Sequence, residues 1–286
     1  MASILASIWC GVALRRIDEE NLIAATASLT EAVLYDALVN YLISMARTVE
    51  SAMNRALDAI VSLESPRTAA LPGEVFLLEP RINEMEIVID EHAVRLLRRG
   101  SYSEDELRLI VSALKITNDL ERIGDLAVNL AQRVITLREM PGAQLPDELA
   151  PMAAAVRAMV SKSLGALIFR NADMAALVLE SDDVVDKYRD TIFEKLMENM
   201  TQQASLVSSG MQFVLATRHL ERIADHATNI AEDIIFWVRG LDVRHGRGLV
   251  VNSAMQAGDT EEVVRITDNS HPLHPGVNVI GDAQPA

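Results

Sequence analysis

Four carboxylates in a duplicated stretch are the residues of this sequence whose type and spacing could do chemistry. LERIGDLAVNLA occupies positions 120–131 and LERIADHATNIA occupies 220–231, with eight of the twelve positions identical. Each copy carries two acids four residues apart, Glu121 with Asp125 and Glu221 with Asp225. Helical residues at this spacing share a face about 6 Å apart along the axis, so each pair could converge on one cation.

A solvated helix face is the competing interpretation of these acids. Arg122 and Arg222 follow the two glutamates directly and could neutralise them in short intrahelical pairs, each worth only a few tenths of a kcal/mol. The same Glu, Asp and Asn frame recurs in both copies, which favours a cation site over an ordinary surface.

Further acids strengthen the metal interpretation. In ESDDVVDKYRD, Asp182 and Asp186 repeat the spacing of four, and internal alignment offers Glu79 and Asn83 in the first half, with Glu86 and Asp90 following. Pro80 puts Glu79 near a predicted helix start, which weakens that half. Oxygen ligands suit a transition or divalent ion such as Fe, Zn, Mn or Mg. The predicted metal ligands are Glu121, Asp125, Glu221, Asp225, Asp182, Asp186 and Glu79.

The histidines are interpreted as packing or surface residues rather than as ligands. His219 and His226 lie beside the second pair, but a single helical histidine is more often a packing residue. His271 and His274 resemble a chelating pair, and we interpret them as incidental because they lie in a predicted disordered tail.

Apolar periodicity predicts the helices that carry these acids. Around the first copy, apolar or small residues alternate at spacings of four and three, which is typical of a helical bundle. Adding one hundred to each position reproduces the pattern, so long helices are expected at about 103–138 and 203–239. The first series is Leu109, Ala113, Ile116, Leu120, Ile123, Ala127, Leu130, Val134 and Leu137.

The remaining helices complete two similar units. A first helix with the same rhythm runs through Leu42, Val49 and Ile60 and ends before Ser65-Pro66, and a second ends near Arg99. Helices at about 146–170 and 173–200 are expected in the second half. The fold class is therefore all-α, with two tandem, similar three-helix bundles.

Composition shifts set the predicted boundaries. Residues 1–38 form an atypical N-terminal segment with helical character, 39–140 the first repeat and 146–240 the second. Residues 241–286 are rich in Gly, Pro and Asn without sustained periodicity, which predicts a disordered tail.

Charge and cysteine content exclude several classes of protein. The 41 acidic against 26 basic residues give a net charge of -15, which argues against nucleic acid as a partner. A single cysteine, Cys10, permits neither an internal disulfide nor a thiolate metal cage. The apolar stretch 4–14 lacks a preceding basic region and is too short to span a bilayer, so we expect a cytoplasmic protein.

With these motifs in place, the sequence resembles the PhoU family of phosphate-specific transport accessory and regulatory proteins. DELRLIVSALKITNDLERIGDLAVNLAQRV and RHLERIADHATNIAEDI resemble the paired third-helix motifs of that family, and the likeness covers about residues 40–240. The resemblance implies two three-helix bundles whose surface E/D-x-x-x-D pairs bind multinuclear metal clusters. Carried over by position, the pairs are Glu121 with Asp125, Glu221 with Asp225 and Asp182 with Asp186.

The resemblance also implies a function. It implies negative regulation of phosphate uptake and of the phosphate-starvation two-component response, through contact with a phosphate ABC transporter and a sensor histidine kinase. A homodimer that meets the membrane only through its partners is expected. An accessory domain of a secondary phosphate transporter, sodium-coupled or of low affinity, is the alternative.

An enzymatic role is not expected. A di-iron centre generally draws Glu-x-x-His pairs into the bundle core, and none of the six histidines has a glutamate three residues before it. The glycine cluster HGRG lacks the spacing of a P-loop. A carboxylate-bridged di-iron protein therefore remains a less favoured alternative.

Overall fold

The computed structural model describes residues 35–98, 100, 102–140, 142–244 and 249–250. Its first described helix covers residues 35–61, and the short 3-10 helix Pro66–Thr68 follows. The predicted N-terminal segment up to residue 34, the two tail histidines and the predicted disordered tail beyond residue 250 lie outside the described residues.

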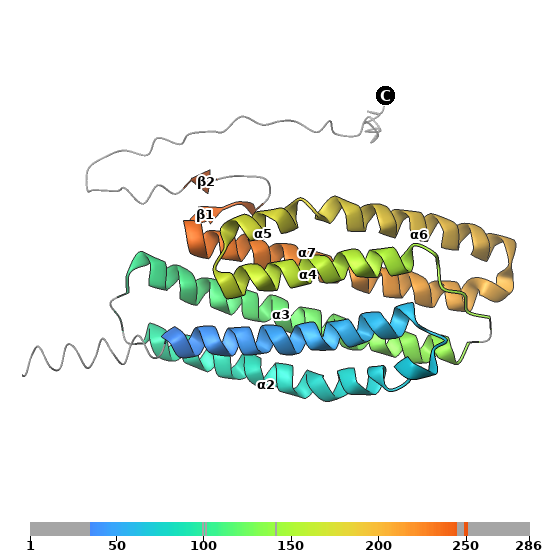
Figure 1. Cartoon of the computed structure of the whole chain (residues 1–286), viewed down its shortest axis with the longest axis horizontal. Coiled ribbons are helices and arrows are strands. Elements are labelled where there is room, and N and C mark those ends of the chain that lie inside the picture. Colours follow the sequence, from blue (N-terminus) through green and yellow to red (C-terminus); the bar gives the residue numbers. More distant parts are fainter. Residues whose placement is uncertain (1–34, 99, 101, 141, 245–248, 251–286) are drawn as a thin grey trace, which may run out of the picture. The chain divides into compact units, whose positions relative to one another are not determined.

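Helices make up both halves of the described chain (Figure 1). The first half continues with α2 (Leu71–Leu97) and α3 (Glu104–Arg138). The second contains α4 (Leu149–Phe169), α5 (Ala172–Leu179), α6 (Asp182–Gln202), a 3-10 turn (Ala204–Leu206) and α7 (Val207–Arg239). The all-α prediction of two three-helix bundles is confirmed, with α5 and α6 together taking the place of one helix.

The predicted apolar positions form the core. All nine seam residues of α3 are buried, as are the nine equivalents in α7, where Ser209 is the polar member. Ser103 begins α3 with a capping box: its side chain accepts from the backbone N–H of Glu106, whose carboxylate accepts from the N–H of Ser103. Gly240 ends α7 at φ 68°, a left-handed conformation that glycine adopts without strain.

Two helix predictions are wrong in detail. The expected helix at 173–200 is broken at Glu180-Ser181, where the Ser181 hydroxyl donates to the Leu177 carbonyl and a new helix starts at Asp182. Helix α2 starts at Leu71, so Pro80 and Glu79 lie inside it rather than near its start. Pro72 in the first turn of α2 provides the actual start signal.

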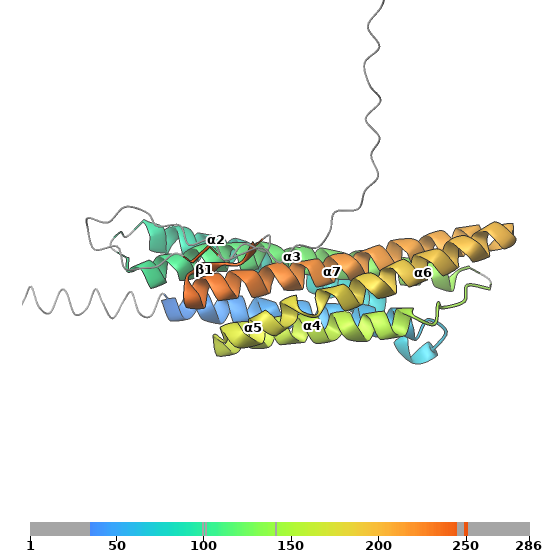
Figure 2. The same ribbon diagram turned by 90° about the horizontal axis from the view of Figure 1, so that it is seen from above.

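The two long helices α3 and α7 lie side by side and join the halves (Figures 1 and 2). Interhelical contacts link Lys115 to Asp233 near one end and Arg133 to Gln212 near the other. Residue numbers increase along α3 from Lys115 to Arg133, whereas those of their partners on α7 decrease from Asp233 to Gln212, so the two helices are antiparallel. Helix α7 also packs on α4, α5 and α6, and therefore forms the centre of the second half.

Helix α4 is long and apolar enough to cross a membrane by length and composition, but half of its apolar window is buried within the bundle.

After α7, the strand β1 (Leu241–Asp242) pairs antiparallel with β2 (Leu249–Val250). This short hairpin falls in the segment predicted to be disordered, and residues 245–248 between its strands are not described.

Candidate metal centre

Four predicted carboxylates converge between α6 and α7. Asp182 and Asp186 lie on α6 and face Glu221 and Asp225 on α7, and the charges of these groups act on one another. Burial raises the pKa of Asp225 above its usual value, and the negative charge of Glu221 raises it further. Burial and then the charge of Asp186 raise the pKa of Asp182 in the same way. Concentrated negative charge of this kind is what a hard cation would relieve.

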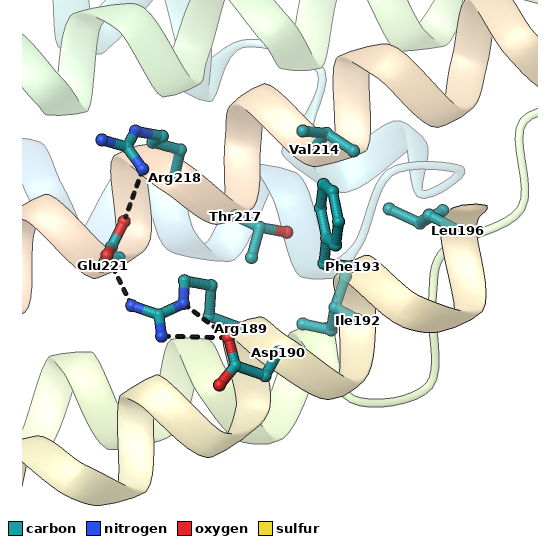
Figure 3. A pocket seen from close by; sticks show the side chains of 9 residues that line it. All are labelled: Arg189, Asp190, Ile192, Phe193, Leu196, Val214, Thr217, Arg218 and Glu221. Carbon is teal, nitrogen blue, oxygen red and sulfur yellow. Dashed lines mark hydrogen bonds and ion pairs between the residues drawn. The ribbon is translucent and has the colours of Figure 1, made fainter. Parts of the chain in front are cut away.

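Arg189 contacts two acids of this second cluster, which consists of Asp182, Asp186, Glu221 and Asp225, and Figure 3 shows its contact with Glu221. Its Nη1 lies 2.7 Å from an oxygen of Asp186 and 2.7 Å from an oxygen of Glu221, so one guanidinium bridges α6 to α7. Its Nη2 lies 2.9 Å from Asp190. The other oxygen of Glu221 is buried without a hydrogen bond, and Arg218 approaches that oxygen only to 3.7 Å.

The first cluster consists of Glu121 and Asp125 on α3 and Glu86 on α2, and it is also formed by acids on two neighbouring helices. Burial raises the pKa of Glu121, and the charge of Asp125 adds to it, followed by that of Glu86 on α2. The pKa of Glu86 is raised as well, by burial and then by the charge of Asp90. Arg122 lies 3.4 Å from Glu121 and 3.6 Å from Asp125, so it is a looser counter-ion than Arg189.

Glu86, rather than the predicted Glu79, is the α2 carboxylate whose charge acts on the first pair. Glu79 lies seven residues earlier, about 10 Å along the helix, and is not among the charges that act on Glu121. The buried residues Ile82, Ile89 and Ala93 of α2 match the buried Val185, Ile192 and Leu196 of α6 at an offset of 103, so the counterpart of Glu86 is Arg189. Ile82 packs closely on α3, because a Cβ on Gly124 would lie 3.1 Å from it.

The predicted acids are less exposed than an outward helix face implies. Only 15% of the Glu121 side chain and 14% of the Glu221 side chain are exposed, because each faces the neighbouring helix α2 or α6. Asp125 is 38% exposed. Each long helix therefore presents one half-buried and one more accessible carboxylate per cluster.

The sequence did not indicate a second polar centre, which lies between α3 and α7. His226 shares a 2.7 Å contact with Asp119, and the Asn229 amide donates to the same oxygen at 3.2 Å. In this structure His226 therefore pairs with Asp119 across the interface between α3 and α7. Asp119 is not part of the repeated pattern, because the corresponding residue one hundred positions later is His219.

Carboxylates alone make these clusters suitable for hard cations rather than for thiolate-preferring ones. Among the described residues, no three His, Cys, Asp or Glu side chains are close enough to hold a metal ion as they stand. At the second cluster, Arg189 lies between two of the acids. Binding there requires the carboxylates to turn towards a shared cation, which their position at the helix surface permits.

A family model described as the PhoU domain matches this chain twice, at residues 42–134 and 149–234. The chain belongs to the PhoU family. Both PhoU matches begin after the atypical N-terminal segment and end before the tail, and each contains one acidic pair of the long helices.

Individual PhoU relatives agree with the family match. The chain is 38% identical over 209 residues to the phosphate-specific transport system accessory protein PhoU homolog of Pseudomonas aeruginosa, covering 72% of this chain and 84% of that protein. It is 32% identical over 193 residues to PhoU homolog 1 of Thermotoga maritima, covering 65% and 81%.

Solved PhoU structures share the fold. The crystal structure of PhoU from Pseudomonas aeruginosa superposes with a TM-score of 0.68 at 35% identity, covering 73% of this chain and 99% of that one. PhoU from Streptococcus pneumoniae gives a TM-score of 0.67 at 24% identity, which is a likeness of fold.

The raised pKa of Asp225 makes a prediction for stability. A carboxyl group with a raised folded-state pKa stabilises the fold below its unfolded value, 3.8 for Asp, and loses that contribution as the pH rises through the folded value. Asp225→Asn should therefore stabilise chelator-treated protein at pH 7, by no more than about 0.5 kcal/mol because Asp225 is only partly buried and solvent screens its charge. The gain should shrink towards pH 4. Urea unfolding at pH 7 and 4.5 measures it, and an equal loss of stability at both values would contradict the electrostatic explanation.

Proposed function

We propose that this PhoU-family chain is an accessory regulator of phosphate transport that restrains uptake when phosphate is plentiful. The observation that carries the proposal is the doubled PhoU match. The relative that is 38% identical over 84% of its own length, and is named as a phosphate-specific transport accessory protein, supports it further. The regulator acts by binding, without catalysing a reaction.

The proposed partners are a phosphate ABC transporter and its sensor histidine kinase, which the protein meets from the cytoplasm as a homodimer. Two similar helical units in one chain support a bridging role, since each could present its own acidic flank to a different partner. An accessory role for a secondary phosphate carrier is the alternative. Capture of the ABC transporter's ATPase subunit, rather than a secondary carrier, distinguishes the two.

We also propose that the two acidic clusters bind divalent or transition metal ions. The convergence of Asp182, Asp186, Glu221 and Asp225 supports the second site. At the first site, Glu121 and Asp125 lie with Glu86, and Glu79 would be an outlying ligand. Bound metal would supply positive charge that neutralises these acids and holds the second and third helices of each half together.

Deletion of the gene should raise phosphate uptake and the expression of phosphate-starvation genes in phosphate-rich medium. The full-length chain supplied from a plasmid should restore repression. Uptake of labelled phosphate and a starvation-promoter reporter measure both responses. Unchanged uptake and unchanged reporter activity in the deletion strain would refute the regulatory role.

Neutralising one acidic pair should remove metal without unfolding the bundle. Glu221→Gln with Asp225→Asn keeps side-chain shape but removes the charge that binds a hard cation, so metal content should fall. Glu194→Gln with Glu198→Gln is a matched control, because this exposed pair on α6 has the same spacing outside the cluster. Elemental analysis and circular dichroism provide the two measurements. Wild-type protein that takes up no Fe, Zn, Mn or Mg would refute the metal proposal.

A further inference from the structure

Arg189 places a permanent positive charge where the second cluster would hold a cation. Its Nη1 is 2.7 Å from an oxygen of Asp186 on α6 and 2.7 Å from an oxygen of Glu221 on α7. Figure 3 shows the contact with Glu221. The arginine side chain is 30% exposed and Glu221 is 14% exposed, so this contact is partly shielded from solvent. The guanidinium is therefore an internal counter-ion shared by α6 and α7.

A metal ion and this guanidinium cannot use the same two oxygens at once. Carboxylate oxygens bind divalent cations at roughly 2.0–2.6 Å, which would bring a cation between Asp186 and Glu221 into contact with Nη1. A guanidinium does not lose its proton in proteins. A protonated carboxyl group could admit a metal ion by losing its proton, but Arg189 keeps its charge and must rotate away from the two oxygens.

The surroundings of Arg189 allow that rotation. Asp190, on the solvent side, already binds Nη2 at 2.9 Å and is 65% exposed, so it can keep the guanidinium paired outside the cluster. On its other side, Arg189 lines a cavity of about 230 Å³ between α6 and α7, together with Phe193, Leu196 and Val214. Movement of the arginine would therefore change one wall of this cavity.

We propose that Arg189 is a built-in competitor that a metal ion must displace, and that it thereby lowers the metal affinity of the second cluster and couples metal occupancy to the α6–α7 cavity. This inference rests on the proposed metal binding. The first cluster lacks an equivalent arginine. The buried residues of α2 and α6 align at an offset of 103, which puts Glu86 at the position of Arg189. Metal binding at the second cluster thus involves an exchange of cations, which makes that site responsive to metal concentration.

The test compares Arg189→Met with Arg218→Met in the full chain. Arg218 also lies near Glu221, but its side chain is 71% exposed and its nearest approach is 3.7 Å, so it is a matched control. Both changes are made with Glu121→Gln and Asp125→Asn, which leaves the second cluster as the site to be measured. Mn²⁺ is titrated into chelator-treated protein and followed by electron paramagnetic resonance.

Arg189→Met should lower the Mn²⁺ dissociation constant about tenfold, as expected for removing one positive charge near a divalent ion at a partly exposed site. Arg218→Met should change it less than about twofold. The rise in Tm on adding Mn²⁺ should also be larger for Arg189→Met than for its parent. Arg189→Lys keeps the charge but not the contact with both acids, so its Mn²⁺ dissociation constant should lie between those of the parent and of Arg189→Met. It also provides a second folded variant.

Three results would overturn the proposal in distinguishable ways. Unchanged or weaker Mn²⁺ binding by Arg189→Met, with normal binding by its parent, would show that Arg189 positions the acids instead of competing for them. Equal tightening by both arginine variants would show a general charge effect. An absence of Mn²⁺ binding in the parent and in every variant would refute the metal proposal itself and this inference with it.

Discussion

Antiparallel packing of α3 on α7 is the constraint on which the rest of the described structure depends. Each long helix buries its apolar seam within its own half and a second stripe against the other long helix. Because an α-helix has 3.6 residues per turn, two buried stripes leave only a limited part of the helix surface for polar side chains. The acidic pairs occupy the flank next to α2 or α6, so their half-buried position is a consequence of this packing.

The interface between α3 and α7 contains polar side chains, and the polar residues contributed by the two halves of the chain differ. Asp119 meets His226 and Asn229 at one end, whereas the position equivalent to Asp119 is His219. Burial lowers the pKa of His219, and its Nδ1 is buried without a hydrogen bond. A buried polar contact constrains the register of two helices, because leaving either group unpaired costs free energy. The two halves therefore repeat their cores, while their shared interface is not symmetrical.

Periodicity in the sequence was sufficient to predict what depends on apolar burial. The seams of α3 and α7, and the apolar face of the first helix, follow directly from a spacing of four and three. The convergence of Asp182 and Asp186 with the α7 pair also followed, because these acids repeat the same spacing on a neighbouring helix. Whether they bind metal remains a prediction.

Features that depend on the register between helices could not be read from one helix at a time. The effect of Glu86 on Glu121 depends on how α2 packs on α3, where Ile82 lies against Gly124. The insertion of Arg189 depends on the distance between α6 and α7, which no local spacing encodes. Asp119 was missed for a similar reason, since its partners are more than one hundred residues away.

The most direct test of the interface between α3 and α7 is a double-mutant cycle between Asp119 and His226, measured by urea unfolding at pH 7. If this contact holds α3 against α7, Asp119→Ala and His226→Ala should be non-additive, with a coupling energy of about 1–3 kcal/mol. Additive effects, within about 0.3 kcal/mol, would contradict the account, because the pair would then contribute nothing to the interface from which the acidic flanks take their position.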